Sequence, residues 1–409
     1  MWIALLDRAL RRFVRHGGLT LVTPDGQRRS YGENKEPAVT VRLRDATLAR
    51  RLVIDPELAL GEGYVDGALE IAGDDLQGLL ELAMRNLHAA PMRGAIRFKR
   101  LARRSRRLVD QFNPAARARR NVAHHYDLSG ALYALFLDED RQYSCAYFRR
   151  PDDTLEAAQH QKKAHIAAKL HLVPGMRVLD IGCGWGGMAL SLARDHGARV
   201  LGITLSQEQL AVARARARAA GLEARVEFRL MDYRALEGRF DRIVSVGMFE
   251  HVGAPHFRTY FRTLRNLLAE DGVALIHTIG RSGPPGATNP WIARYIFPGG
   301  YIPALSEVSA AIERERLVSC DIEVLRLHYA LTLRHWFERF SANEAQARAL
   351  YDARFCRMWR FYLAASEQAF RHGGLCVFQF QLTRNQLAVP ITRDYLYEPP
   401  LHATQRAAE

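Results

Sequence analysis

The sequence predicts a doubly wound α/β domain with a smaller accessory domain at its N-terminus. In the second part of the chain, short apolar runs alternate with helical segments, which is the pattern of a parallel sheet covered by helices on both faces. One of these runs, VLDIGCGWGG at 178–187, passes from a buried strand through glycines directly into a helix. The first part of the chain contains neither such a turn nor a cluster of catalytic residue types. We therefore place the functional centre in the second part.

The expected strands of this domain follow one another at the spacing of βα units. They cover 177–181, 199–204, 226–231, 241–246 and 273–278, and a late strand lies near 377–382. Because parallel strands present their carboxyl ends at one edge of the sheet, the residues that end them are expected to meet a ligand. Those residues are Asp180, Thr204, Asp232, Gly247 and His277.

The accessory domain is expected to mix strands and helices. AVTVRLR at 38–44 is strand-like, and DDLQGLLELAMRNL at 74–87 has helical periodicity. The dipeptide Asn113-Pro114, which follows an arginine-rich stretch, marks the linker. We expect the accessory domain at 1–115 and the catalytic domain at 116–409.

The glycine turn can cradle a nucleotide, and two motifs fit it. Gly182, Gly184 and Gly186 match the G-x-G-x-G of S-adenosylmethionine (SAM) binders. Gly182, Gly184 and Gly187 match the G-x-G-x-x-G of dinucleotide binders. A turn that serves only strand–helix packing is a third interpretation.

The following strand favours SAM. A nicotinamide binder places an Asp or Glu about 20 residues after the glycines to hold the ribose, whereas strand 199–204 ends in Thr204. Asp180 before the glycines and Gln209 beyond Thr204 suit a ligand that carries an amine, a carboxylate and no phosphate. We therefore expect SAM as the cofactor.

The amino-acid composition limits the classes of protein to which this chain can belong. The 409 residues are 48% hydrophobic, which is ordinary for a globular protein. No stretch approaches the roughly 20 uncharged apolar residues that a membrane span needs, and Asp7 and Arg8 interrupt the N-terminal WIALL, so it is not a secretory signal. We expect a cytosolic protein. The five cysteines have neither disulfide nor zinc spacing, so we expect reduced thiols and no metal.

The net charge of +14 indicates either an anionic partner or a genome whose base composition favours arginine. Nearly all of the positive charge is arginine, which a GC-rich genome would produce without any function. The charge is nevertheless clustered between Arg93 and Arg120, with apolar residues at roughly helical spacing and no aromatic platform for single-stranded nucleic acid. We therefore expect a peripheral contact with an anionic phospholipid surface rather than with nucleic acid. The amphipathic segment 1–18 fits the same role or a plain core helix.

Further motifs flank the glycine turn. They are HYDLSGALY at 125–133, YSCAYF at 143–148, GITLSQEQ at 202–209, DRIVSVGMFEHVG at 241–253, HTIG at 277–280, YIFPGG at 295–300 and HYALTL at 328–333. Together with DPELALGEGYVDG at 55–67, they extend over most of the chain. In these motifs and their order, the chain resembles the cyclopropane-fatty-acyl-phospholipid synthase family, which includes the mycolic acid cyclopropane synthases.

The resemblance implies that the SAM methyl group becomes a methylene bridge across the cis double bond of a phospholipid acyl chain. Such a site must hold the alkene in line with the sulfonium methyl, exclude water and place a weak base beside a carbocation-like intermediate. In the family that base is a bound bicarbonate. The residues implied to hold it are Cys145, Glu250, His277, the backbone of Ile279, and Tyr329. Because a carboxylate that faces bicarbonate forms a like-charge pair, one partner must share a proton.

The resemblance also implies the contacts of SAM. They are Tyr143, Ser144, Gly182, Gly184, Thr204 and Gln209, with Asp232 and Tyr233 at the adenine end. Asp180 joins this set because it ends the strand before the glycines. The end of the chain is expected to supply elements that bind the acyl chain.

Several of these residues also have a purely structural interpretation. Taken alone, Cys145 would be a small buried residue and His277 a core histidine. Glu250-His251 could cap the next helix, and His124-His125 lacks the context of a zinc site. Aromatics of RFCRMWRFYLA at 354–364, such as Trp359, Phe361 and Tyr362, fit either the core or the lining of an acyl tunnel.

One departure from the family pattern is Ser129-Gly130-Ala131, where the family commonly has Gly or Ser, then Asn or Asp, then Asp. Polar contacts near the entrance of the site are therefore expected to differ, which leaves the head-group preference open. The departure also keeps a SAM-dependent fatty-acyl C-methyltransferase, giving methyl- or methylene-branched chains, as the alternative, because such relatives share most of the motifs.

We expect a cytosolic, peripherally membrane-associated enzyme that uses SAM to cyclopropanate unsaturated phospholipids. Besides the C-methyltransferase, the alternatives are a small-molecule N-methyltransferase, which would not need liposomes, and a basic lipid- or nucleic-acid-binding protein with a relic SAM fold. The intact set of motifs argues against the relic. The sequence is compatible with a homodimer and does not select the double-bond position.

Overall fold

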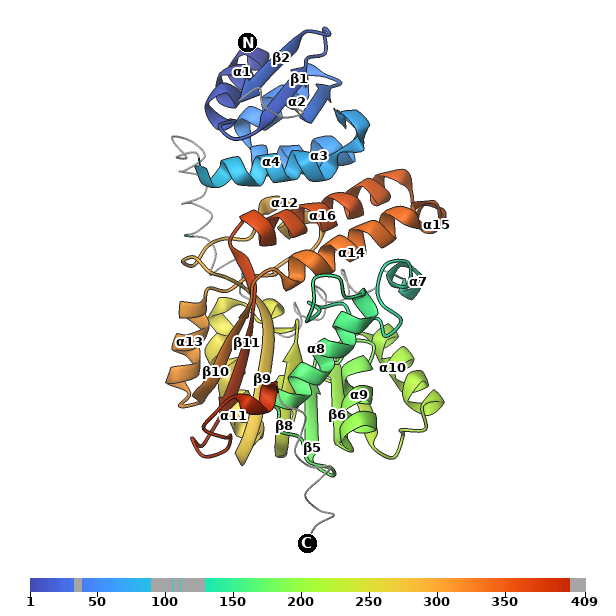
Figure 1. Ribbon diagram of the computed structural model, residues 1–409, viewed down its shortest axis with the longest axis vertical. Helices are drawn as coiled ribbons and strands as arrows, with labels where there is room; N and C mark the ends of the chain where they lie inside the picture. The colour runs from blue at the N-terminus through green and yellow to red at the C-terminus, as the bar shows by residue number, and fades with distance from the viewer. Residues whose placement is uncertain (33–38, 90–104, 106–110, 112–128, 398–409) are drawn as a thin grey trace.

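The computed structural model describes residues 1–32, 39–89, 105, 111 and 129–397. The expected linker at Asn113-Pro114, the arginines clustered in 93–120 and the pair His124-His125 lie outside the described residues. The described parts form three layers along the long axis of the molecule: an N-terminal unit, a layer of helices, and a large sheet with its own flanking helices (Figure 1). In these ranges no helix is long and apolar enough to cross a membrane.

The N-terminal unit is built on a four-stranded sheet of order β2-β1-β3-β4. Its elements are α1 (Trp2–Phe13), β1 (Gly18–Val22), β2 (Arg28–Gly32), β3 (Val39–Leu43), α2 (Ala46–Ile54), α3 (Pro56–Val65), β4 (Leu69–Ile71) and α4 (Leu76–Ala89). Asp45 starts α2 because its carboxylate accepts a hydrogen bond from the Leu48 N–H at 2.9 Å. The apolar face of α1, with Leu6 at its centre, packs against the core of this unit. This is the core-helix interpretation of segment 1–18.

The large sheet has seven strands in the order β10-β11-β9-β8-β5-β6-β7. The strands are β5 (Arg177–Ile181), β6 (Arg199–Thr204), β7 (Val226–Leu230), β8 (Phe240–Val246), β9 (Leu268–Arg281), β10 (Val318–Leu325) and β11 (Leu375–Thr383). Strands β5 to β9 pair in parallel, whereas β11 runs antiparallel between β9 and β10. The strand order reverses between β5 and β8, and in open α/β sheets ligands bind at this switch point, outside the carboxyl ends of the strands.

Helices cover both faces of the large sheet, as doubly wound topology requires. Three helices pack on one face: α8 (Leu155–Lys169), α9 (Gly187–His196) and α10 (Gln207–Ala219). Two pack on the other: α11 (Phe257–Leu267) and α13 (Leu305–Arg314). The alternation follows from the strands, since Val178 faces the first group of helices and its neighbour Leu179 the second. Both side chains are fully buried, because helices cover β5 on both faces.

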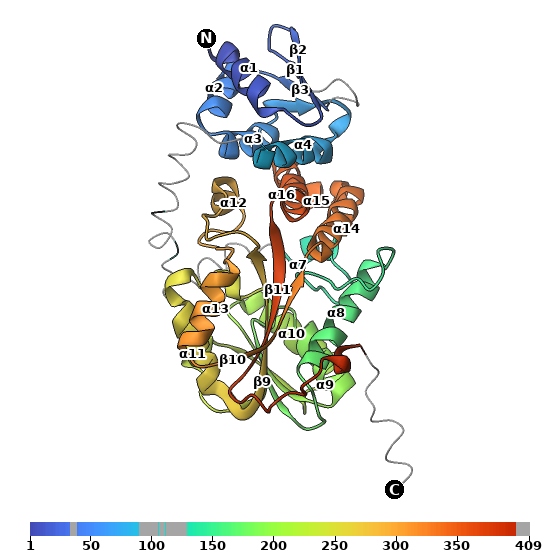
Figure 2. The same cartoon turned by 60° about the vertical axis from the view of Figure 1, so that its left-hand side comes forward.

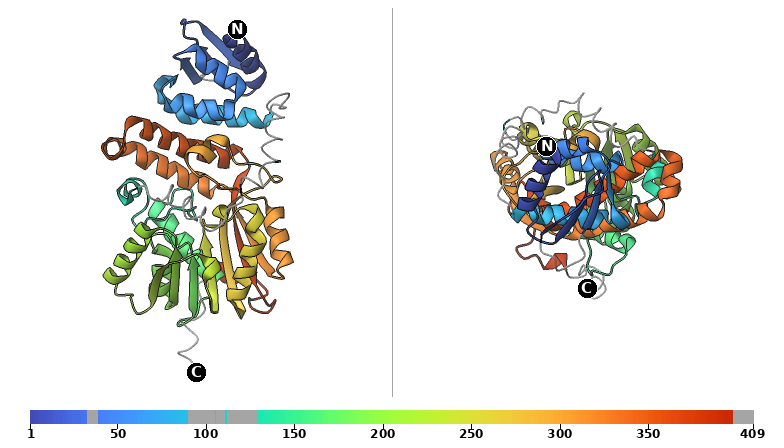
Figure 3. Two further views of the ribbon diagram at one scale, coloured as in Figure 1. Left: turned by 180° about the vertical axis from the view of Figure 1, so that it is seen from behind. Right: turned by 90° about the horizontal axis from the view of Figure 1, so that it is seen from above.

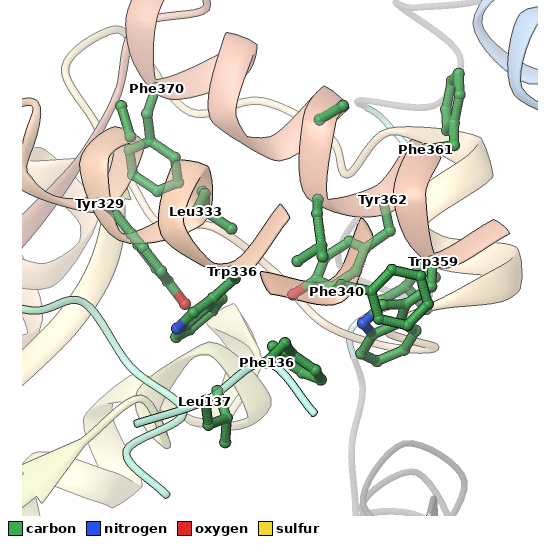
Figure 4. Packing of buried hydrophobic residues seen from close by; sticks show 14 of the residues in the cluster. Phe136, Leu137, Tyr329, Leu333, Trp336, Phe340, Trp359, Phe361, Tyr362 and Phe370 are labelled. Atoms are coloured by element: carbon green, nitrogen blue, oxygen red, sulfur yellow. The ribbon is translucent and has the colours of Figure 1, made fainter. Parts of the chain in front are cut away.

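A layer of helices lies between the N-terminal unit and the carboxyl ends of the parallel strands (Figures 1 and 2). It contains α7 (Gly130–Ala134), α12 (Pro290–Tyr295), α14 (His328–Ala342), α15 (Glu344–Leu350) and α16 (Ala353–His372). Figure 4 shows aromatic side chains from this layer packed together, including Trp336, Phe340 and Trp359. Helices α3 and α4 of the N-terminal unit pack on α16, and the stacking is the same when seen from behind (Figure 3).

The structure confirms the expected fold class and most of the expected strands. The parallel strands match their predicted ranges to within a few residues, although β9 begins earlier and ends later than 273–278. Strand β10 was not predicted, because VSCDIEVL carries acidic side chains that occur in a strand only where its position in the sheet accommodates them. Asp321 and Glu323 are accommodated at the sheet edge by ion pairs with Lys169 from α8, at 3.3 and 2.6 Å.

Candidate active site

The glycine turn joins β5 to α9 at the switch point of the sheet. The N–H groups of Gly182 and Cys183 donate to the Ile203 carbonyl at 2.9 and 3.0 Å, which ties the turn to β6. Gly182, Gly184 and Gly186 all have positive φ, at 81, 53 and 86°. A Cβ on Gly186 would lie 2.8 Å from Phe228, whereas a Cβ on Gly184 would meet no protein atom within 4 Å. Gly186 therefore serves packing, and Gly184 borders open space.

This open space is a cavity at the carboxyl ends of β5, β6 and β8, which we call the glycine-turn cavity. Its wall contains all nine residues that the sequence associates with SAM: Tyr143, Ser144, Asp180, Gly182, Gly184, Thr204, Gln209, Asp232 and Tyr233. They come from four separate segments of the chain. The structure thus brings the whole predicted set to one place, while the role of each residue remains a prediction.

The polar groups of the glycine-turn cavity differ in how they are held. Thr204 Oγ1 donates to Gln209 Oε1 at 2.9 Å, so these two side chains orient one another. The Asp232 carboxylate accepts from Arg234 Nε and Nη2 at 2.8 and 2.6 Å. Asp180 instead keeps one buried carboxylate oxygen, Oδ2, without a hydrogen-bond partner among the described residues. Burial raises the pKa of Asp180 to about 7. An ammonium group in the cavity would satisfy this oxygen.

A second, much larger cavity of about 1790 Å³ lies next to the first, and we call it the apolar cavity. Its wall includes Leu333 of α14, Phe361 and Tyr362 of α16, and apolar side chains from α1 to α4 and the strands of the N-terminal unit. It exceeds the roughly 300–1,000 Å³ that is usual for small-molecule sites. Phe361 and Tyr362 therefore line a cavity, as the acyl-tunnel interpretation expects, although they also belong to the aromatic core, whereas Trp359 belongs to that core and is not among the residues that line the cavity (Figure 4).

The five residues associated with bicarbonate also line the apolar cavity: Cys145, Glu250, His277, Ile279 and Tyr329. Glu250 sits in a short 3-10 helix after β8 (Phe249–His251) and accepts a hydrogen bond from the Ile279 N–H at 2.6 Å through Oε1. Its other oxygen, Oε2, is buried and has no partner among the described residues. Burial raises the pKa of Glu250 to about 7. Glu250-His251 is thus part of a site wall and does not cap a long helix.

The other members of this cluster are neutral hydrogen-bonding groups. Burial and nearby cations such as Lys162 lower the pKa of His277 to about 3, and burial raises the pKa of the Cys145 thiol. The Gln379 amide nitrogen lies 3.1 Å from His277 Nδ1 and can only donate to it, which leaves the proton of the neutral ring on Nε2. Tyr329 packs edge-on against Trp336, with ring centroids 5.8 Å apart (Figure 4). Neutral donors beside a carboxyl group that titrates near 7 can bind a small anion.

The two cavities share part of their walls. Tyr143, Ser144, Gly247 and His251 line both. The Tyr143 hydroxyl lies 2.9 Å from the Tyr362 hydroxyl, and its ring stacks on Trp336 with centroids 5.1 Å apart. The segment around Tyr143 therefore separates a cavity with several polar groups in its wall from an apolar one and contacts both.

Sequence reasoning missed several residues of this site. His251 lines both cavities, and burial lowers its pKa to about 4. Lys162 of α8 donates to Gln142 Oε1 at 2.5 Å and to Ser144 Oγ at 2.9 Å. Gln379 lies opposite His277 on β11. The sequence signal for Lys162 was weak, because it lies in the polar run QHQKK at 159–163, which is typical of a solvated helix face. Gln379 had none, because strand pairing alone brings it to His277.

The departure Ser129-Gly130-Ala131 lies at the start of α7. Ser129 Oγ accepts from the Leu132 N–H at 3.4 Å, and the Gly130 N–H donates to Glu208 Oε1 at 2.9 Å. These three residues are not among those that line the two cavities. Among the described residues, no group of three or more His, Cys, Asp or Glu side chains is arranged to hold a metal ion.

Comparison with known proteins places the chain in a family. The family model of mycolic acid cyclopropane synthetase matches residues 114–380, and a domain of unknown function matches residues 14–92. The chain is 38% identical over 413 residues to a probable fatty acid methyltransferase of Pseudomonas putida, covering 97% of this chain and 100% of that protein. It is 37% identical over 355 residues to the cyclopropane-fatty-acyl-phospholipid synthase of Escherichia coli K12, covering 86% and 89%.

A solved structure agrees with these matches. The mycolic acid cyclopropane synthase CmaA1, complexed with SAH and CTAB, superimposes with a TM-score of 0.62 at 34% identity, covering 67% of this chain and 99% of that one. The strand order, the glycine turn and the cavity beside it define a class I SAM-dependent methyltransferase. Within that class, the chain belongs to the mycolic acid cyclopropane synthetase family.

Proposed function

We propose that the protein transfers a methylene group from SAM to the cis double bond of unsaturated phospholipid acyl chains and so forms cyclopropane fatty acids. The observation that carries this proposal is the junction of the two cavities at Tyr143 and Ser144, with the buried Glu250 cluster on the apolar side. A polar cavity suits the zwitterionic cofactor, and an apolar cavity of this size suits a lipid. Reaction can occur only where the two ligands meet.

The proposed reaction forms and breaks only a few bonds. When bound, SAM supplies an electrophilic methyl group; the alkene forms a C–C bond to it as the S–C bond breaks, the transferred carbon loses a proton, and the ring closes. The chain must therefore exclude water from a cation and keep the reactants aligned. The aromatic rings of Tyr143, Phe361 and Tyr362 line the route to the junction. Their faces can stabilise positive charge without acting as nucleophiles.

We also propose bicarbonate as the base that takes this proton. The residues that would hold it are Cys145, Glu250, His277 and Tyr329. The unpartnered Glu250 Oε2 and the neutral state of His277 support the fit, because a carboxyl group with a pKa of about 7 can share a proton with a weakly basic anion. The Ile279 N–H is donated to Glu250 in the structure, so we assign it the orientation of that carboxylate rather than a direct contact.

The N-terminal unit supports a lipid substrate. Its α1, α2 and α4 contribute apolar side chains such as Leu10, Leu52 and Leu87 to the wall of the apolar cavity. We propose that residues 1–115 form a lipid-associating domain and residues 116–409 the catalytic domain, as the two separate sheets suggest. We further propose that the enzyme works at the cytoplasmic face of an anionic membrane and does not bind nucleic acid.

The membrane contact can be tested with vesicles. Co-sedimentation with phosphatidylglycerol vesicles should weaken as salt rises past physiological strength, where the Debye length is about 8 Å. Neutralising Arg103, Arg104, Arg106 and Arg107 should raise the apparent KM for vesicles more than it lowers kcat. Neutral phosphatidylcholine vesicles serve as the control. Unchanged binding of the neutralised variant would assign the arginines to a solvated surface.

One alternative function has a specific observation in its favour. The probable fatty acid methyltransferase of Pseudomonas putida matches this chain over its whole length. A fatty-acyl C-methyltransferase would use the same two cavities and leave a methyl or methylene branch. A methylene branch forms when a hydride shifts between the two former alkene carbons before the transferred carbon loses its proton, and a saturated methyl branch needs a hydride donor in addition. The fate of the cation, rather than the binding of either ligand, therefore separates the two outcomes.

The identity of the product decides between them. The purified enzyme, SAM and vesicles of an unsaturated phosphatidylglycerol should yield a lipid whose mass has grown by one CH2 group. Because a methylene branch adds the same mass, proton NMR is needed: ring protons lie far upfield, and branch protons are vinylic. Ring protons would support cyclopropanation, and terminal =CH2 protons, which are resolved from the CH=CH protons of unreacted lipid, would support the branched product. Methylation of small amines without any lipid product would contradict both.

A further inference from the structure

Lys162 is a fully buried cation that neither the fold nor the proposed reaction explains. It lies on α8 with no exposed surface, and its ammonium donates to Gln142 Oε1 at 2.5 Å and to Ser144 Oγ at 2.9 Å. Desolvation of a lysine disfavours its charged form, and burial indeed lowers the pKa of Lys162 to about 8. A buried charge is costly unless it is paired or hydrogen-bonded. A methionine of similar length would fill this position in α8 without that cost.

The hydrogen bond from Lys162 determines whether the Ser144 hydroxyl acts as a donor or as an acceptor toward other groups. A hydroxyl has one proton to donate, and its oxygen accepts. Because an ammonium has no acceptor, Ser144 Oγ must accept from Lys162, which leaves the Ser144 proton to be donated elsewhere. Lys162 is the partner of this hydroxyl among the described residues, and Ser144 lines both cavities. Ser144 is therefore prepared to donate to an acceptor that enters from a cavity.

The backbone of the same segment is held from α8 as well. Gln159 Nε2 donates to the carbonyls of Gln142 and Ser144 at 3.3 and 3.0 Å. The Gln142 amide accepts from Lys162 through Oε1 and donates to Asp140 Oδ2 through Nε2 at 2.9 Å. Neither end of the segment can rotate to offer an acceptor to the cavity without losing a bond. The hydrogen bonds from α8 thus fix the orientation of Ser144.

Across the glycine-turn cavity from Ser144, the wall carries a hydrogen-bond acceptor instead of a donor. Asp180 keeps Oδ2 buried and without a hydrogen-bond partner in the described ranges, and burial raises its pKa to about 7, so an ammonium group that enters the cavity would favour its ionised form. One wall thus offers a carboxyl group that can pair with an ammonium, and the other offers a donor backed by a cation. A ligand that carries both an ammonium and a carboxylate, such as the amino-acid end of SAM, complements this pair.

We propose that Lys162 is a positioning residue for the cofactor, which holds Ser144 as the donor that recognises the carboxylate of SAM. Lys162 acts through Ser144 and does not touch the ligand. This inference rests on the SAM site proposed above. In this arrangement, recognition of the carboxylate depends on a buried lysine that lies 18 residues beyond Ser144 in the chain, on a different element.

The test compares two ligands that differ only in the carboxylate: S-adenosylhomocysteine and its decarboxylated analogue. Calorimetry on the full-length enzyme gives the dissociation constant of each. Wild type should prefer the ligand with the carboxylate, since a hydrogen bond to a charged group corresponds to roughly 10- to 100-fold in affinity. Lys162→Met should weaken S-adenosylhomocysteine by about that factor, leave the analogue nearly unchanged, and so bring the ratio of the two constants close to one.

Two further variants separate positioning from general damage. Ser144→Ala should reduce the ratio in the same way, and the double variant should lose no more than either single variant, because both act on one interaction. Lys169→Met is the matched control: Lys169 is equally buried on the same helix, pairs with Glu323 at 2.6 Å, and lines neither cavity. It should lower the melting temperature and leave the ligand ratio at the wild-type value.

The outcomes are distinct. If Lys162→Met weakens both ligands equally, or neither, Lys162 has only a structural role and the inference fails while SAM binding stands. If Lys162→Met does not fold, Lys162→Gln, whose amide can still donate to Ser144 Oγ, should keep the wild-type ratio, and Ser144→Ala should lose it. An unchanged ratio in Ser144→Ala overturns the inference. If wild type binds neither ligand, it is the proposed SAM site that fails.

Discussion

The glycine-turn cavity and the apolar cavity meet at Tyr143 and Ser144, but they are made in different ways. The first is built at the ends of β5, β6 and β8, where parallel pairing brings loops together by register. The second combines β9, α14 and α16 with the N-terminal unit, so its walls come from opposite ends of the chain. A cofactor site can therefore be recognised from local motifs, whereas a lipid site of this kind depends on the packing of whole units.

The largest expected effect is on the glycine-turn cavity. In Gly184→Val, the side chain would project into space that no protein atom occupies within 4 Å, so it would collide with a ligand and not with the fold. Affinity for S-adenosylhomocysteine should fall by at least about 100-fold, equivalent to some 3 kcal/mol of binding free energy. Calorimetry measures this loss.

The control for Gly184→Val is Gly221→Val. Gly221 also has a positive φ, at 64°, and open space around its Cβ, but it lies outside both cavities. It should share the backbone strain and keep normal affinity. Normal affinity in Gly184→Val, or tight binding of NADH by wild type, would contradict the assignment of this cavity to SAM.

The next effect is confined to the apolar cavity. Glu250→Gln keeps the shape of the side chain and removes the group that is expected to orient the base. Turnover should fall by roughly 10²-fold or more, the scale of lost acid–base function, while S-adenosylhomocysteine affinity is retained. Steady-state kinetics with vesicles, set beside calorimetry, tests whether the two cavities can be disabled separately.

The shared anion gives this experiment a second arm. His277→Ala and Tyr329→Phe should act like Glu250→Gln, and combinations should be far from additive because one bound anion is shared. Wild type should slow in bicarbonate-depleted buffer and recover on addition of bicarbonate. A rate that ignores depletion, together with a near-normal Glu250→Gln variant, would assign the base to another group.

The buried carboxyl group of Glu250 should also change how the free energy of unfolding depends on pH. Burial raises its pKa from 4.5 to about 7, so the folded state disfavours the ionised form. No penalty exists below pH 4.5, where both states are protonated, and the penalty grows until pH exceeds about 7, where it reaches roughly 3 kcal/mol. Glu250→Gln should therefore be more stable than wild type at pH 8 and nearly equal to it at pH 4.5. Urea unfolding at the two pH values measures the difference; equal stabilities at pH 8 would mean that the carboxyl group is solvated.

The smallest expected effect is the pH dependence of turnover. If the ionised Glu250 is the active form, kcat/KM should fall about tenfold per pH unit below a pKa near 7. His277, whose pKa burial lowers to about 3, stays neutral through this range and adds no inflection. The residual activity of Glu250→Gln should lack the inflection near 7. An unchanged inflection in that variant would place the titrating group elsewhere, with Asp180 as the first candidate.

Much of the catalytic domain could be predicted because its signals are local. Strand β5 contains the apolar residues Val178, Leu179 and Ile181 and is followed at once by glycines, and the glycine motif, Thr204 and Gln209 lie within one short stretch of chain. The residues associated with SAM and with bicarbonate do gather at two neighbouring cavities. The assignment of the second set to bicarbonate came from resemblance, whereas SAM was already favoured over a dinucleotide because strand 199–204 does not end in an acidic residue.

By itself, then, the sequence determined the doubly wound fold, since hydrophobic periodicity and glycine stereochemistry act over a few residues. Only the tertiary structure decided that β10 joins the sheet edge beside Lys169, that Gln379 orients His277, and that Lys162 stands behind Ser144. It also decided that apolar side chains of the N-terminal unit line the apolar cavity together with β9, α14 and α16. These contacts join residues that are distant in the chain and depend on burial and strand pairing, which no local pattern encodes.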